Sequence, residues 1–333
     1  MKSEFKKVRG LGLCSGGLDS ILAGLVLKEQ GVEVEWISFE TPFFSAEKAR
    51  KASAMTGIPL RVENITPVYL EMLKNPQCGY GQQMNPCLDC HALMFRLAGQ
   101  IMDRDGFDFL FSGEVLGQRP MSQTRPSLRY VEKNSGFDGW ILRPLCAQHL
   151  PETLPEKDGR VDRDRLLDFS GRGRKRQIAL AHRFGITDYP APAGGCLLTD
   201  KGYCARLKDL FEHESDPSEN ELHLLRYGRH FRLNPTTRLI IGRTQQENEQ
   251  IMAYCDPSTD VLLKTSRFPG PTALLPKGAG KEVITLAAAV CAGYSKAPID
   301  LPVEVGVTVD GTEKVVRVLP IPPAEVKKFL IQS

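Results

Sequence analysis

The sequence has few of the features that would place a protein in a membrane or outside the cell. No apolar run approaches the roughly 20 residues that span a bilayer, and the first seven residues, MKSEFKK, contain no secretory apolar segment. We therefore expect a cytoplasmic protein without a membrane partner. The net charge is only +3, so composition neither requires nor excludes a polyanionic partner.

Cysteine is the residue type that stands out in an otherwise ordinary composition. The chain has 333 residues, and at roughly 100–200 residues per domain this length predicts two domains. Nine of the residues are cysteines, an odd number that is high for a cytosolic chain. In a reducing compartment these cysteines favour metal binding or catalysis over a framework of disulfides.

Strands and helices alternate through the first 150 residues. This alternation predicts a parallel sheet covered by helices on both faces, with ligands bound beyond the carboxyl ends of the strands. Apolar and alternating runs predict strands at 8–14, 32–39, 60–65, 107–112 and 140–145, and helical periodicity predicts helices from residue 18 onward and at 46–55, 67–73 and 88–103.

The sequence changes character after about residue 210. We expect an α/β domain over 1–210 and a smaller α+β domain over 211–333. The second domain has predicted strands at 238–242 and 260–264, helices at 244–254 and 281–293, a loop rich in Pro and Gly at 266–280, and a β-hairpin at 303–319 around Asp310-Gly311.

A turn rich in glycine and serine, Ser15-Gly16-Gly17-Leu18-Asp19-Ser20, joins the first strand to the first helix. Helix N-termini present backbone N–H groups and a positive dipole end to anions, and glycines let the backbone approach phosphate closely. For two glycines alone, a tight turn without a ligand is an equal alternative. The absence of a following Gly-Lys-Ser/Thr excludes a Walker A motif. The string resembles the PP-loop of the ATP pyrophosphatase superfamily, whose Rossmann-like domains are of the adenine nucleotide alpha hydrolase type.

Three cysteines are candidate ligands or sulfur carriers. Cys87 and Cys90 form a C-x-x-C at the start of the 88–103 helix, where the helix N-terminus favours thiolates. Cys196 follows two glycines and is the natural third member. A [4Fe–4S] cluster on these three would leave one iron open to an external sulfur. A zinc site, which would need further ligands, and a persulfide on one cysteine resolved by another remain alternatives.

Most other cysteines have simpler interpretations. Cys14 and Cys291 lie in apolar segments and are expected in the core. Cys78, in the loop that leads to Cys87, is a weaker candidate for the thiol site. His91 is adjacent to Cys90, but neighbouring helix residues diverge by about 100°, so it is a weaker candidate ligand.

Taken together, these segments resemble the tRNA 4-thiouridine synthetase family. Residues 113–124, GEVLGQRPMSQT, are similar to that family's loop after the fourth strand, and Arg143-Pro144-Leu145 is similar to its Arg-Pro-Leu segment. The likeness covers about residues 8–200. From the sequence we expect no counterpart of the family's N-terminal THUMP domain or of the rhodanese domain of some members. Residues 231–295 instead resemble the RNA-binding domain of NFACT proteins, through the segment IGRT at 241–244 and Glu247-Asn248.

The resemblance implies an ATP site around the glycine turn. The phosphates would lie on Ser15 to Ser20, with Gly113 and Gln118 contacting them from the opposite loop, and the adenine would lie near Phe39. Mg²⁺ would accompany ATP, held by phosphate oxygens and Asp19, although Asp19 could instead only cap its helix. Arg143 would either stabilise phosphate charge or pair with a carboxylate.

The resemblance also implies the reaction. A uridine oxygen of tRNA attacks the α-phosphate, pyrophosphate leaves, and sulfur held at Cys87, Cys90 and Cys196 then displaces AMP. The sulfur donor, protein or inorganic, and the oligomeric state are not indicated by the sequence. The basic segment 160–183, with eight Arg or Lys against three Asp, would be an RNA track or a solvated face.

Two other classes of function stay open. One is a PP-loop enzyme that transfers sulfur to a small molecule or amidates one. The other is a non-catalytic RNA-binding or regulatory protein with a relic nucleotide site, which the intact string at 15–20 and the three cysteines disfavour.

Overall fold

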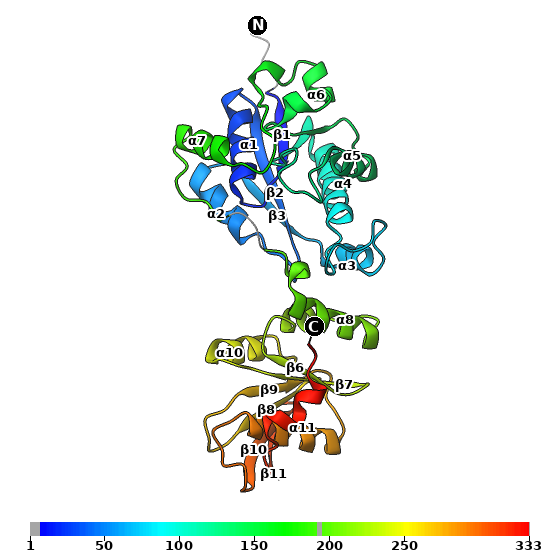
Figure 1. Cartoon of the computed structure of the whole chain (residues 1–333), viewed down its shortest axis with the longest axis vertical. Coiled ribbons are helices and arrows are strands. Elements are labelled where there is room, and N and C mark those ends of the chain that lie inside the picture. The colour runs from blue at the N-terminus through cyan, green and yellow to red at the C-terminus, as the bar shows by residue number, and fades with distance from the viewer. Residues whose placement is uncertain (1–6, 192–194, 333) are drawn as a thin grey trace. The chain divides into compact units, whose positions relative to one another are not determined.

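The computed structural model in Figure 1 describes residues 7–191 and 195–332. The chain divides into two compact units, the first ending at Cys196 and the second beginning at Leu197. The expected domain boundary at residue 210 falls within a helix of the second unit (Lys201–His213). Among the described residues, no helix is long and apolar enough to cross a bilayer.

The first unit contains a five-stranded sheet with the order β3-β2-β1-β4-β5, and every pair in it is parallel. The fold class predicted for this part of the sequence is therefore confirmed. Its strands are β1 (Arg9–Leu13), β2 (Glu33–Glu40), β3 (Leu60–Asn64), β4 (Phe109–Ser112) and β5 (Ile141–Leu142).

Helices cover both faces of this sheet, α1 and α7 on one side and α4 and α5 on the other (Figure 1). The α1 face is sealed by a core that contains Leu22, Trp36 and Phe111. The helices are α1 (Leu18–Glu29), α2 (Glu47–Thr56), α3 (Thr66–Lys74), α4 (Cys87–Asp105), α5 (Arg125–Ser135), α6 (Leu154–Lys157) and α7 (Lys175–Arg183).

The second unit is built on a six-stranded antiparallel sheet with the order β11-β10-β8-β9-β7-β6. It confirms the expected α+β class. Its elements are α8 (Lys201–His213), α9 (Glu219–Leu224), β6 (Arg229–Asn234), β7 (Thr237–Ile241), α10 (Gln245–Ala253), β8 (Val261–Thr265), β9 (Thr272–Leu275), α11 (Lys281–Gly293), β10 (Val303–Val309), β11 (Thr312–Val318) and α12 (Pro323–Val326).

Local sequence explains two features of this sheet. The hairpin β10–β11 turns through Asp310 and Gly311, both with positive φ, as the Asp-Gly pair predicted. Helix α11 packs on the sheet through the small residues 287–292, all of them buried, which let its backbone come close to the strands.

One expectation about the second unit was wrong. The segment 266–280 was expected to be a loop, but it contains β9, whose four residues are all buried and pair with β7 and β8. Pro271 and Pro276 flank this short strand. The strand is not recognisable in the sequence, because four residues between two prolines, three of them apolar, give too little periodicity to identify a strand.

The turn between β1 and α1 depends on glycine at position 16. Gly16 has a φ of +69°, and a Cβ there would overlap the backbone of Lys48 and Ala49 in α2. Gly31, after α1, has a φ of +87°, but a Cβ added there would meet no atom within 4 Å. The two glycines thus share a left-handed backbone, and only Gly16 also has a close neighbour.

We predict that Gly16→Ala lowers the free energy of unfolding by about 2–5 kcal/mol, the sum of left-handed strain and overpacking. Gly31→Ala, the matched control, should cost only about 1–2 kcal/mol because it adds strain alone. Urea unfolding followed by tryptophan fluorescence measures the difference, since both tryptophans, Trp36 and Trp140, lie in the first unit. Equal losses in the two variants would contradict the close packing of Gly16.

Candidate nucleotide and thiol site

The turn at residues 15–20 has the geometry of an anion cradle. Gly17 caps α1 without any side chain closing the first turn. The Ser20 hydroxyl donates to the Gly17 carbonyl at 2.8 Å, and the Gly17 N–H donates to the Ser15 hydroxyl at 3.3 Å. Since α1 has 12 residues, its N-terminal N–H groups and dipole favour a negatively charged group at this end.

A chain of side-chain amides fixes Asp19 at the edge of this cradle. The Gln118 amide donates to Asp19 Oδ2 at 2.6 Å, and the Gln177 amide donates to Gln118 Oε1 at 2.9 Å. Asp19 therefore bonds to Gln118 rather than capping its own helix. Its other oxygen, Oδ1, is buried and has no hydrogen-bond partner among the described residues.

Two arginines that sequence reasoning did not single out face this carboxylate. Burial raises the pKa of Asp19, while the Gln118 hydrogen bond and the charges of Arg174 and Arg119 oppose the rise. Arg174 comes from the basic segment before α7, and Arg119 from the loop after β4. The basic segment was visible in the sequence, but the electrostatic interaction of Arg174 with Asp19 depends on tertiary structure.

Half of the eight cations in the basic segment pair with carboxylates. Arg160, Arg163, Arg176 and Arg183 each pair with a nearby carboxylate. Their charge is therefore locally balanced, which weakens the interpretation of 160–183 as an RNA track.

The loop after β4 lies directly against the start of α1. A Cβ on Gly113 would collide with the backbone of Asp19 and Ser20, so only glycine allows this approach. The proximity follows from the sheet order, because β1 and β4 are parallel neighbours and their carboxyl ends meet at one edge. Phe39, near the carboxyl end of β2, is 5 % exposed.

Glu114, the residue after Gly113, is the centre of a buried charge network. Its carboxylate accepts from Arg143 Nε at 2.9 Å and from the Ser112 hydroxyl at 3.2 Å, and it bonds to His91 Nδ1 at 3.0 Å. Arg143 also pairs with Glu132 of α5. Of the two alternatives for Arg143, the structure therefore shows pairing with carboxylates, and the guanidinium is 2 % exposed.

The three candidate cysteines converge on Tyr69 of α3. The Tyr69 hydroxyl hydrogen-bonds to the Cys90 thiol, and the thiols of Cys87 and Cys196 act electrostatically on both groups. Burial of the sulfur is the main reason that the pKa of Cys90 lies well above its ordinary value. Gly194, one of the glycines expected to give Cys196 its freedom, lies outside the described residues.

The three thiols all act on Tyr69, but they are not arranged as the ligands of a metal ion. Within residues 7–191 and 195–332, no three His, Cys, Asp or Glu side chains are arranged to hold a metal ion. Cys14 and Cys291 are buried, as expected for core residues, and Cys78 is exposed.

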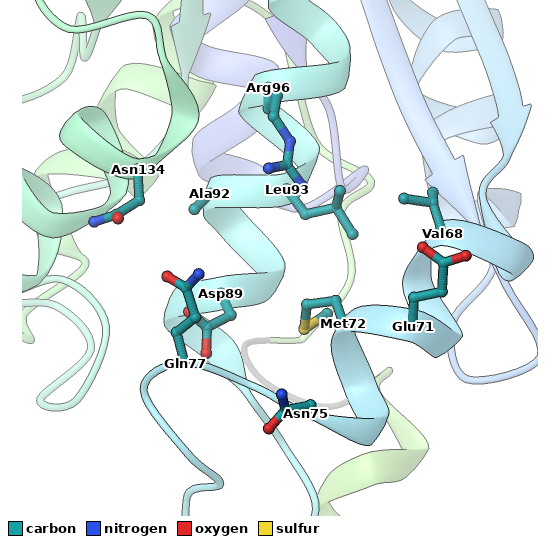
Figure 2. Close-up of a pocket in the computed structure, with 10 residues that line it drawn as sticks. All are labelled: Val68, Glu71, Met72, Asn75, Gln77, Asp89, Ala92, Leu93, Arg96 and Asn134. Carbon is teal, nitrogen blue, oxygen red and sulfur yellow. The ribbon is translucent and has the colours of Figure 1, made fainter.

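The start of the cysteine-bearing helix is anchored by Asp89. Its carboxylate accepts from the Cys78 N–H at 2.8 Å and from the Tyr130 hydroxyl at 2.9 Å. Beside it lies a pocket of about 300 Å³ between α3 and α4, where Glu71 and Arg96 project from the two helices (Figure 2). Asp89 thus holds the loop before α4 and the cysteine helix in one arrangement.

The comparisons with known proteins agree with this two-part structure. Residues 5–150 match the family model described as Thiamine biosynthesis protein (ThiI), and residues 228–330 match the model of the NFACT protein RNA binding domain. The first unit is therefore similar to PP-loop proteins of the ThiI kind, and the second unit carries a segment similar to an RNA-binding domain.

Relatives and a solved structure are similar to part of this chain. A probable tRNA sulfurtransferase of Finegoldia magna is 31% identical over 155 residues, covering 44% of this chain and 38% of that protein. One of Oceanobacillus iheyensis is 27% identical, covering 44% and 37%. A crystal structure of a 4-thiouridine synthetase–RNA complex with bound ATP is 25% identical, covers 41% of this chain and 36% of its own, and has a TM-score of 0.34. The match spans less than two fifths of each relative.

The buried network predicts a specific acid sensitivity. Burial alone would raise the pKa of Glu114, but the charge of Arg143 and the hydrogen bond of His91 overcome it and lower the pKa from 4.5 to about 2. A carboxyl group with a lowered folded-state pKa stabilises the fold above its unfolded value and loses that contribution as the pH falls. We expect about 3 kcal/mol to be lost between pH 4.5 and 2.

Glu114→Gln should remove this part of the pH dependence, and Glu47→Gln, whose side chain is 71% exposed, should leave it unchanged. Urea unfolding by tryptophan fluorescence at a series of pH values measures both. An unaltered slope in Glu114→Gln would show that Glu114 is not held ionised by its neighbours.

Proposed function

We propose that this chain is an ATP-dependent sulfurtransferase that thiolates a uridine of tRNA. The observation that carries the proposal is that the loop after β4 contacts both the glycine turn and the helix that bears Cys87 and Cys90. Gly113 lies on the backbone of the glycine turn, and Glu114 bonds to His91, the neighbour of Cys90. A nucleotide cradle and a group of thiols are thereby held at the same edge of one sheet. The match to the ThiI family model supports this reaction class.

The residues around the turn suit a bound ATP. The backbone from Ser15 to Ser20 would bind the phosphates, with Gly113 and Gln118 on the opposite side. Arg119 and Arg174, already in electrostatic range of Asp19, would balance the triphosphate charge. Phe39, at the end of β2, would border the adenine.

Mg²⁺ fits the carboxylate at the start of α1. Asp19 has a buried oxygen without a partner among the described residues, and hard oxygen ligands suit this cation. Asp19 and the phosphate oxygens would hold it, and the ion would offset phosphate charge. Arg143, buried between Glu114 and Glu132, would act on this site by positioning the 113–118 loop.

The three cysteines suit a sulfur-holding centre. Their donor set, three sulfurs from two segments, fits a [4Fe–4S] cluster once Cys90 turns from its hydrogen bond with Tyr69. Cys87, Cys90 and Cys196 would hold it, and the group would supply a sulfur atom. Two alternatives are zinc bound by these residues and a persulfide on one of them. The first experiment below distinguishes both from a cluster.

The reaction balances as two displacements. The uracil oxygen forms a bond to the α-phosphorus, the bond to the β-phosphate oxygen breaks, and pyrophosphate leaves. Sulfide-level sulfur (HS⁻) held at the cysteines then bonds to the base carbon, AMP leaves with the electron pair of the C–O bond, and the sulfur proton moves to the ring nitrogen that lost its proton in the first displacement. The resemblance of residues 228–330 to an RNA-binding domain supports an RNA substrate, and a protein or inorganic donor would renew the sulfur.

The thiol centre is tested by anaerobic purification with analysis of iron and acid-labile sulfide. We expect about four irons per chain, lost in Cys87→Ala, Cys90→Ala and Cys196→Ala. Cys255→Ala, in the second unit, is the control that should retain them. No iron after anaerobic reconstitution would rule out the cluster, and bound zinc or a mass increase of one sulfur atom would then identify a zinc site or a persulfide.

ATP activation is tested by the formation of AMP and pyrophosphate with bulk tRNA. Asp19→Asn should lower the rate by about 10²-fold or more, since offsetting phosphate charge contributes several kcal/mol to such reactions. Asp103→Asn, an exposed change on α4, should keep the wild-type rate. If wild type releases ADP or no nucleotide product, the proposed reaction is wrong.

A further inference from the structure

Lys48 differs from the other cations of its helix. It is exposed in the first turn of α2, and within the described part of the chain it has no ion pair. By contrast, Arg50 pairs with Glu40 at 3.4 Å, and Lys51 pairs with Glu47 at 3.0 Å. The ammonium of Lys48 is thus the one on α2 whose charge is not balanced by a carboxylate among the described residues.

The backbone of Lys48 is fixed against the nucleotide cradle. A Cβ on Gly16 would overlap the carbonyl of Lys48, so the first turn of α2 touches the glycine turn directly. The Cα of Lys48, from which its side chain starts, therefore has a fixed position relative to the backbone that would bind phosphate.

The ammonium of Lys48 lies on the side of the thiols. Its Nζ is 3.9 Å from the position that a Cβ on Gly195 would take. Gly195 directly precedes Cys196, whose thiol acts electrostatically on Cys90 and Tyr69. One side chain thus extends from the turn that would bind phosphate to the segment that carries the third cysteine.

We propose that Lys48 is a further catalytic residue, whose ammonium contacts the α-phosphate of ATP on the side that faces Cys196. This inference rests on the proposed function. The α-phosphate must lie between the cradle and the sulfur, because the uracil oxygen bonds to it first and sulfur later displaces it as AMP. Negative charge grows on its oxygens in the first displacement and on the departing oxygen in the second.

A cation at that place stabilises both charges more than it stabilises bound ATP. The role is electrostatic only, so the proposal requires no proton transfer. Lysine suits this role because its ammonium is a compact point charge on a flexible stem. It can follow the α-phosphate as the bond to the β-phosphate oxygen breaks.

The test compares Lys48→Ala with Lys51→Ala, which removes the same charge from the same helix one turn away. In the full chain, Lys48→Ala should lower the kcat for AMP formation about 10²-fold, as loss of one charge-stabilising donor does elsewhere. Lys48→Arg should recover part of the rate, and Lys51→Ala should match wild type. Iron content should be equal in all four proteins. Equal kcat in Lys48→Ala and Lys51→Ala would overturn the proposal, as would loss of iron in Lys48→Ala alone.

Equilibrium binding of AMP separates this inference from the proposed function. If wild type forms no AMP with tRNA, the proposed reaction fails, but the contact with the α-phosphate is still measured. Lys48→Ala should then bind AMP at least several-fold more weakly than Lys51→Ala. Equal AMP affinity in the two variants, together with the absence of turnover, would reject the contact itself.

Discussion

The buried ion pair between Glu114 and Arg143 is the interaction on which the geometry of the site depends. It joins the residues that follow β4 and β5, and its other partners, His91 and Glu132, come from α4 and α5. Burying two charges carries a large desolvation cost, so a buried ion pair is a weak source of net stability even where the charges hold each other ionised. Its role here is positional, because the residue before Glu114 lies against the glycine turn at 15–20 and the residue before His91 is Cys90.

The order of elements in the first unit could be predicted because each strand and turn carries its own signal. The apolar run before Ser15 and the left-handed glycines after α2 and α4 mark boundaries that the structure places within a residue or two. Strand β9 could not be predicted, since its four residues acquire their strand character from pairing with β7 and β8. Short segments of this kind are defined by tertiary partners rather than by local sequence.

Some residues of the candidate site could likewise be predicted from the sequence and others could not. Residues in continuous motifs, such as Ser15 to Ser20 and the C-x-x-C, could be proposed from the sequence because their spacing alone suggests chemistry. Gln177 and Lys48, which lie near the glycine turn, come from distant segments and show nothing unusual locally. The basic segment that contains Arg174 is visible in the sequence, but the sequence does not indicate which of its cations acts on Asp19. Arg143 shows the limit of motif reasoning, since its neighbours Glu114 and Glu132, not its own segment, determine that it pairs with carboxylates.

The position of Cys196 at the end of the first unit has a consequence for how the two units work together. The second unit begins at the next residue, so its first Cα is about 3.8 Å along the chain from that of Cys196. Whatever occupies the thiols is therefore tethered, through a single peptide bond, to the unit that resembles an RNA-binding domain. Anything bound at these thiols would in this way be linked to the second unit by the covalent chain itself.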